Sequence, residues 1–309
     1  MRPFRFGFQT REGSAHQLLS QARQAEAAGF DVFHTADHLA DGWSALAPLL
    51  AVADATTTIR ICPLVLNNDF HHPALLAQEV ASIDHLSGGR LELGLGAGHS
   101  FTEYTAIGLP FDPPSVRKAR LAEAVEVIRR LLDGESVTYD GAHYHLHNVK
   151  TLRSQQDHLP LLVGVNGKAA LAHAARQADI IGLTMLGRTL EDGHRHEARW
   201  QPERLDATIA HIDEQAGARR DTLELHALIQ AVVITDDRRA AAEELAAEVP
   251  GLSLDDALTT PFLALGTHDE MARHLSMCRE RWGISYVSVR DIDGFAPVIE
   301  RLKAQDGRR

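Results

Sequence analysis

The feature that most constrains the fold of this chain is the alternation of short β-like runs with amphipathic helices along its whole length. Phe4, Phe6 and Phe8 alternate with other residues as in a strand, whereas Leu18 and Ala22 keep helical spacing. Strands that alternate with helices indicate parallel βαβ units. The expected strands are residues 4–10, 31–37, 59–67, 91–95, 161–165, 180–184, 223–234 and 286–289.

Local start and stop signals delimit the helices. Ser14 with Gln17 and Thr267 with Glu270 have capping-box spacing, and Gly29 is placed to close the first helix. The other expected helices are residues 44–55, 73–86, 116–132, 169–177, 203–216, 238–247 and 295–303.

Eight strands in 309 residues fit a closed (β/α)₈ TIM barrel better than a doubly wound sheet. No stretch rich in Pro, Gly or Ser marks a domain boundary, so we expect one α/β domain over residues 1–309. Three stretches are expected to be insertions at the C-terminal face of the strands: a hairpin at about 135–148, and longer loops at about 186–201 and 249–261.

The composition excludes several classes of partner. The formal charge of −11 argues against nucleic acid and anionic membranes. Cys62 and Cys278 are far apart in the sequence, which favours two free thiols in a reducing cytosol over a disulfide. The chain has no apolar run of about 20 residues and no signal-peptide pattern at its start. We therefore expect a cytoplasmic protein that acts on a small molecule.

Polar residues follow the predicted ends of most strands. In a barrel these ends share one rim, where function collects. Any rim is polar, but the number of converging groups favours a site. The residues concerned are Gln9, Asp37, His38, Asn67, Asn68, Asp69, Gly96, Gly98, His99, Gly164, Val165, Asn166, Gly167, Lys168, Thr184, Arg188, Arg290 and Asp291.

Two of these groups suggest chemistry. A histidine at a barrel mouth can act as an acid or base, and His38 is such a residue, with the Asp37 carboxylate fixing its tautomer. A single structural hydrogen bond is the alternative. The glycines of 164–168 before a helix suggest an anion site, to which Lys168 and Arg188 add charge. This stretch is neither a Walker loop nor a dinucleotide-binding fingerprint.

A rival signal is the run His143, His145 and His147. Period-two spacing would place three imidazoles on one face of a strand, as in a zinc site of a barrel hydrolase. The alternative is a solvated face of the hairpin. Because no carboxylate cluster stands nearby in the sequence, we expect no metal.

Several ordered motifs give the chain a family resemblance. It resembles the bacterial luciferase-like superfamily, in particular its coenzyme F420-dependent oxidoreductases of actinobacterial type. The motifs are Asp37-His38, residues 27–31, 72–79, 84–90 leading into 94–98, 111–114, 120–123, 143–144, 178–179 and 266–271.

The resemblance implies a (β/α)₈ barrel that binds an 8-hydroxy-5-deazaflavin at the strand C-termini. In such relatives a His matching His38 serves as acid or base near the deazaflavin C5, and a non-prolyl cis peptide, matching about Asn67–Asn68 here, supports the ring. Hydride transfer at C5, coupled to protonation by His38 or His99, is the expected reaction on a carbonyl, imine or activated C=C. The alternative is an FMN-dependent two-component monooxygenase.

The resemblance also assigns residues to roles. The expected catalytic residues are His38, Asp37 and His99. The expected cofactor-binding residues are Asp37, His38, Leu66, Asn67, Asn68, Gly96, Gly98, Gly164, Val165, Asn166, Gly167, Thr184 and Arg188, and the expected substrate-binding residues are Gln9, Trp43, Glu103 and Arg290.

One departure bears on the substrate. Some sugar-phosphate dehydrogenases of the family place an acid directly after the strand-four glycines, where this chain has His99, with Glu103 four residues later. This difference argues against a sugar phosphate. Dimerisation is common among such relatives, and we expect a homodimer.

Overall fold

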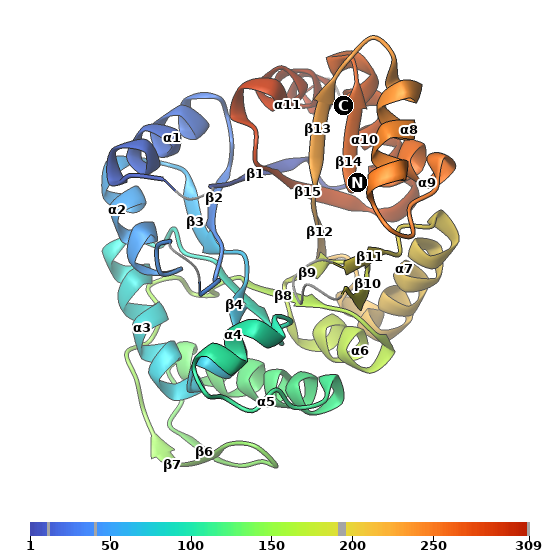
Figure 1. Cartoon of the computed structure of the whole chain (residues 1–309). Helices are drawn as coiled ribbons and strands as arrows, with labels where there is room; N and C mark the ends of the chain where they lie inside the picture. The colour runs from blue at the N-terminus through green and yellow to red at the C-terminus, as the bar shows by residue number, and fades with distance from the viewer. Residues whose placement is uncertain (11–12, 40–41, 191–195, 308–309) are drawn as a thin grey trace.

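The computed structural model describes residues 1–10, 13–39, 42–190 and 196–307, without the side chains of Leu186, Arg188 and Thr189. Its main sheet is parallel throughout and curls into a barrel, with the helices outside (Figure 1). The strand order is β3-β2-β1-β15-β12-β9-β8-β5-β4. The bounds are β1 Arg5–Gln9, β2 Val32–Thr35, β3 Arg60–Pro63, β4 Leu66–Asn67, β5 Leu93–Gly96, β8 Leu161–Val165, β9 Ile180–Leu183, β12 Glu224–Leu228 and β15 Ile284–Val289.

The third expected strand is interrupted. Its two parts, β3 and β4, lie at the two ends of the strand order, and a parallel bridge between Ile61 and Leu91 joins those ends. The nine segments therefore make eight strands, and the expected (β/α)₈ barrel is confirmed.

The helices begin and end close to their sequence signals. Both capping boxes form, at Ser14 with Gln17 and at Thr267 with Glu270. Their bounds are α1 Ala15–Ala27, α2 Ala47–Ala55, α3 Pro73–Leu86, α4 Phe101–Ala106, α5 Pro114–Leu132, α6 Lys168–Gln177, α7 Pro202–Ala216, α8 Arg238–Glu248, α9 Leu254–Thr259, α10 His268–Trp282 and α11 Ile292–Asp306, with 3₁₀ turns η1 Asn68–Phe70 and η2 Gly217–Arg219. In the described residues, no helix has the length and apolar character needed to cross a membrane.

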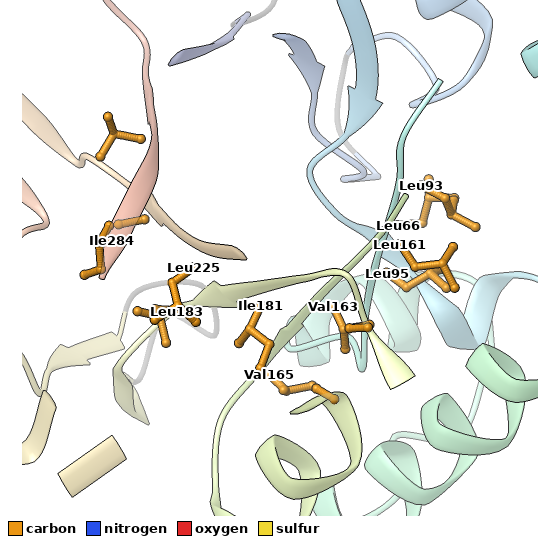
Figure 2. Packing of buried hydrophobic residues seen from close by; sticks show 14 of the residues in the cluster. Leu66, Leu93, Leu95, Leu161, Val163, Val165, Ile181, Leu183, Leu225 and Ile284 are labelled. Carbon is orange, nitrogen blue, oxygen red and sulfur yellow. The ribbon is translucent and has the colours of Figure 1, made fainter. Parts of the chain in front are cut away.

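The larger core lies between the barrel and the helices. Alternate residues of each strand point outward to it, such as Leu161, Val163 and Val165 of β8 and Leu93 and Leu95 of β5 (Figure 2). Because both faces of a parallel strand are buried, such strands form near-continuous apolar runs in the sequence.

The inward-pointing residues form layers along the barrel axis. Near the N-terminal ends of the strands, Arg5 pairs with Glu92 and, at 2.6 Å, with Glu224, and Arg60 pairs with Glu92 at 2.7 Å. A small apolar cluster follows, and then a polar layer. The cluster is Val32, Cys62, Leu162, Ile180 and Tyr286; the polar layer is His34, His226 and Ser288.

The expected seventh strand at 223–234 is divided. Its first part, β12, stays in the barrel, whereas β13 (Ala231–Ile234) leaves it and pairs with β14 (Leu263–Gly266). The sequence analysis did not predict β14, which lies between the loop expected at 249–261 and the capping box at Thr267. The short helix α4 was also not predicted.

The three stretches expected as insertions contain secondary structure of their own. An antiparallel pair, β6 (Val137–Asp140) with β7 (His145–Val149), occupies the first, and α9 lies in the third. The described part of 186–201 forms another antiparallel pair, β10 (Leu186–Thr189) with β11 (His196–Ala198); residues 191–195 lie outside the described part.

Candidate active site

A cavity of about 1120 Å³ opens at the C-terminal ends of the barrel strands. Most of the expected site residues line it, because parallel strands bring their C-terminal ends to one rim. These are Gln9, Asp37, His38, Trp43, Leu66, Asn67, Gly96, Gly98, His99, Glu103, Gly164, Val165, Asn166, Thr184 and Arg290.

Other candidates, among them Asn68, Gly167 and Lys168, do not line the cavity. Asn68 is buried outside the cavity lining, and its amide donates to the Tyr144 hydroxyl at 3.2 Å. Gly167 caps α6, and Lys168 is the exposed first residue of that helix. Arg188 belongs to β10, and its side chain lies outside the described residues.

His38 forms the main hydrogen bond between titratable groups at the cavity mouth. Its Nδ1 lies 2.8 Å from Oε1 of Glu103, which α4 carries. The imidazole is about half exposed, with 48% of its side chain accessible, whereas the Glu103 side chain is only 7% accessible. A carboxylate oxygen accepts, so Nδ1 of His38 donates and Nε2 is left for a proton exchanged with a ligand.

The expectation that Asp37 orients His38 is wrong. Asp37 instead accepts the backbone N–H of Asn67 at 2.7 Å, and its carboxylate lies 3.7 Å from Nε2 of His71. Asp37 and His38 therefore have different partners although they are adjacent in the sequence.

Two further imidazoles continue from His38, first His99 and then His196 beside His99. The ring centroids of His38 and His99 are 5.5 Å apart, and those of His99 and His196 are 5.2 Å apart. Over the described ranges, no three side chains of the His, Cys, Asp and Glu types form a group that could hold a metal ion. On the hairpin, His145 pairs with Asp140 at 2.7 Å.

Asn67 is held by a buried network below the rim. Its side-chain oxygen accepts the Asp69 backbone N–H at 3.1 Å and lies 3.0 Å from the Tyr104 hydroxyl. Burial, with Asp69 2.9 Å from the hydroxyl, raises the pKa of Tyr104 to about 12, so this group stays a phenol. A Cβ on Gly98, whose φ is +71°, would lie 2.5 Å from the Asn67 oxygen, so only glycine fits there.

The sequence reasoning missed two cations of α5, Arg117 and Lys118, which line the cavity. Arg117 donates to the carbonyls of Ala97 and Gly98 and lies 4.0 Å over the Phe111 ring. A Cβ on Gly167 would lie 3.3 Å from the Lys118 ammonium. Burial and the nearby Arg117 lower the pKa of Lys118.

Lys118 therefore lies beside the N-terminus of α6, where backbone N–H groups favour an anion. It escaped sequence reasoning because a lysine between two arginines in a long amphipathic helix is typical of a solvated face.

Gln9, Gln230 and Arg290 form a hydrogen-bonded polar cluster on another part of the cavity wall. Arg290 donates through Nε to Gln9 at 2.7 Å and through Nη1 to Gln230 at 3.3 Å. Gln9 is buried and donates in turn to the Leu64 carbonyl at 3.1 Å. At the rim, Trp43 is about half exposed and donates to the Gly13 carbonyl at 3.0 Å.

A non-prolyl cis peptide is present, but between Leu64 and Val65. Its expected place around Asn67–Asn68 is wrong by three residues. The strand β3 ends at Pro63, four residues before the predicted strand end, and the cis bond follows that earlier end.

Comparisons with known proteins identify related sequences. A family model described as luciferase-like monooxygenase matches residues 2–275. A 5,10-methylenetetrahydromethanopterin reductase of Archaeoglobus fulgidus is 31% identical over 225 residues, which are 73% of this chain and 63% of that protein. An F420-dependent glucose-6-phosphate dehydrogenase of Microbacterium testaceum is 33% identical over 187 residues, 57% of this chain and 55% of the relative. The matches thus cover between half and two thirds of each relative.

A solved structure supports the fold. The coenzyme F420-dependent tetrahydromethanopterin reductase of Methanopyrus kandleri superposes with a TM-score of 0.77, covering 97% of this chain and 100% of that one at 20% identity.

Proposed function

Because the chain belongs to the luciferase-like monooxygenase family, we propose that it is a coenzyme F420-dependent oxidoreductase acting on a small organic substrate. The named activities of its relatives support the cofactor. The observation that carries the proposal is the hydrogen bond between His38 and Glu103 at the mouth of a cavity large enough for a ring cofactor and a substrate.

The residues present fit a deazaflavin with an anionic tail. Gly96 and Gly164 form part of the cavity wall, and a Cβ on Gly96 would lie 2.6 Å from the Val65 side chain, so the wall has no room for a larger residue. Lys118, Arg117 and the N-terminus of α6 supply the positive field that a phosphate requires on a chain of net charge −11.

When bound, the coenzyme would supply the hydride, which is exchanged at the deazaflavin C5. His38 holds or releases the accompanying proton at Nε2, because Nδ1 is committed to Glu103. The buried Glu103 carboxylate holds the ring through Nδ1 and so fixes the direction of Nε2. Asp37 fixes the backbone at Asn67 beneath the ring site.

The substrate would enter at the side lined by Trp43, Gln9 and Arg290, which can contact a polar group of the substrate. His99 beside His38 is the second candidate for the proton donor. We also propose a homodimer, which light scattering of the purified chain would test.

An FMN-dependent monooxygenase that uses oxygen is the second candidate, favoured by the description of the matching family. Oxygen dependence of turnover distinguishes the two, since a reduced deazaflavin does not activate oxygen.

The proposal is tested by titrating the purified protein with oxidised coenzyme F420 and, in parallel, with FMN, and by screening carbonyl, imine and activated-alkene substrates with reduced F420. We expect saturable binding of F420 alone. The His38→Ala variant should keep this binding and lose about 10²–10⁴-fold in turnover, the usual contribution of a general acid–base. Binding of FMN alone, with oxygen-dependent turnover, would establish the monooxygenase instead. Full turnover in His38→Ala would remove His38 from the mechanism.

A further inference from the structure

A histidine on the floor of the cavity is joined to a chain of buried hydroxyls and imidazoles. His226 of β12 lines the cavity and is only 2% exposed. Its Nε2 lies 2.9 Å from Oγ of Ser288 on β15. That hydroxyl is 3.1 Å from Nε2 of His34 on β2, which is also 3.0 Å from the Tyr286 hydroxyl. A Cβ on Gly7 would lie 2.2 Å from Oγ of Ser288, so the contacts require glycine there.

The proton positions in this series of hydrogen bonds can be assigned by starting from His34, the imidazole that does not line the cavity. Nδ1 of His34 lies 3.2 Å from the Cys62 carbonyl, which can only accept, so Nδ1 carries the proton. Burial lowers the pKa of His34 to about 3, and the ring is neutral. Nε2 of His34 is therefore an acceptor with one lone pair.

The Tyr286 hydroxyl donates to this lone pair on Nε2 of His34. Burial raises the pKa of Tyr286 well above its ordinary value, so it remains a donor. The single proton of Ser288 is then directed to its other neighbour, Nε2 of His226. If Ser288 donated to His34 instead, the buried Tyr286 hydroxyl would be left without an acceptor, which is costly.

His226 is consequently an acceptor at Nε2. Burial, with His34 and Arg5 nearby, lowers the pKa of His226 well below its ordinary value, and a neutral imidazole carries its one proton on Nδ1. Among the described residues, no atom forms a hydrogen bond with Nδ1 of His226. Nδ1 is also not one of the buried side-chain polar atoms that lack a hydrogen-bond partner. It is therefore the ring atom that opens on the cavity.

We propose that His226 presents a fixed, uncharged N–H donor to a bound ligand, and that Tyr286 is a positioning residue that sets the His226 tautomer through His34 and Ser288. This inference rests on the proposed function for the identity of the ligand, whose acceptor is a carbonyl oxygen or ring nitrogen of the deazaflavin. An uncharged donor of fixed direction selects such an acceptor without the desolvation cost of a buried cation.

The tautomer is measurable without any ligand. Two-bond ¹H–¹⁵N spectra of the ¹⁵N-labelled protein distinguish Nδ1–H, Nε2–H and doubly protonated rings, and the His226 signals are identified by their loss in His226→Asn. We expect the Nδ1–H tautomer for both His34 and His226, unchanged between about pH 5.5 and 8.5. An Nε2–H tautomer of His226, or a ring that titrates in this range, would overturn the proposal.

Tyr286→Phe tests the positioning role, because Tyr286 is fully buried and does not line the cavity. Without the phenol proton, Ser288 can donate to His34, so His226 should shift toward the Nε2–H tautomer. An unchanged Nδ1–H signal in a folded variant would contradict the role of Tyr286. If the variant does not fold, Ser288→Ala is used instead. This substitution removes the donor to Nε2 and should give a mixture of both His226 tautomers. A pure Nδ1–H form would contradict the proposed series of hydrogen bonds.

Ligand binding tests the donor itself. We expect His226→Leu to weaken binding of oxidised F420 about tenfold, as for one neutral hydrogen bond, and His226→Asn, which keeps an N–H near Nδ1, to stay within about threefold of the wild type. Equal affinity of His226→Leu and the wild type would remove the donor role. If the wild type binds no F420, the proposed function fails, while the ligand-free spectra still decide the tautomer.

Discussion

Pairing of single side chains decides the chemistry at this site. His38 takes its carboxylate partner from Glu103, 65 residues away in the chain, and not from the adjacent Asp37. The sequence analysis placed both acids among the site residues but could not pair them with His38. Glu103 reaches His38 from α4, a helix that the sequence analysis did not predict. Lys118 is a similar case, since only the packing of α5 against α6 brings its ammonium to the cavity.

At the residue scale, Lys118→Met should raise the Kd for coenzyme F420 about tenfold and reduce the salt dependence of binding, because one partly buried charge next to an anion is lost. The matched control is Lys150→Met, since Lys150 is exposed directly after β7 and does not line the cavity, so this substitution should leave the Kd within about twofold. Fluorescence titration at two salt concentrations measures both. Equal effects of the two substitutions would show that the tail charge is recognised elsewhere.

Some elements are joined by side-chain hydrogen bonds that no local sequence pattern predicts. Glu26 in the last turn of α1 accepts the backbone N–H groups of Thr57, Thr58 and Ile59, at 2.9, 2.6 and 2.9 Å, just before β3. Burial alone would raise the pKa of Glu26, but these donors outweigh it and lower the pKa from 4.5 to about 2. The folded state therefore favours the ionised carboxylate, and this contribution to stability is present above about pH 4.5 and is lost as the pH falls toward 2.

At the element scale, Glu26→Gln should lower the free energy of unfolding by about 1–2 kcal/mol at pH 7, because three N–H groups lose a charged acceptor. The difference from the wild type should narrow as the pH falls below about 4.5. Urea unfolding at pH 7 and near pH 3 measures this, with Glu243→Gln, an exposed i,i+4 pair with Arg239, expected within about 0.5 kcal/mol. A difference independent of pH would refute the role of the Glu26 charge.

The barrel as a whole is closed at its N-terminal end by charges from four strands or their immediate flanks. Arg5, Arg60, Glu92 and Glu224 come from β1, β3, the residue before β5, and β12, and they meet only because the sheet curls on itself. Glu92 contacts both arginines and is 1% exposed. Removing one member of such a buried group leaves the others without compensation.

At the scale of the molecule, Glu92→Gln should lower the free energy of unfolding by about 3–5 kcal/mol, because Arg5 and Arg60 lose their shared carboxylate. Glu300→Gln on the exposed face of α11 is the control and should change it by less than about 0.5 kcal/mol. Denaturant unfolding of both variants measures the difference. A loss below about 1 kcal/mol for Glu92→Gln would mean that the layer is not needed for closure.

The sequence by itself determined most elements of the barrel and the position of the rim. Strand β8, helix α3 and both capping boxes were predicted to the residue, because periodicity and caps act within a few positions. The candidate residues could be found because parallel strands in a barrel deliver their C-terminal ends to one place, whatever the detailed packing.

Only the tertiary structure decided which of these groups touch. The His38–Glu103 pair, the ammonium of Lys118 at α6 and the chain from Tyr286 to His226 each join residues that are distant in the sequence. The departure of β13 from the barrel to pair with β14 is of the same kind. Such contacts depend on how the sheet closes and on how the helices pack against it. Local sequence signals, such as caps and periodicity, do not specify this long-range packing.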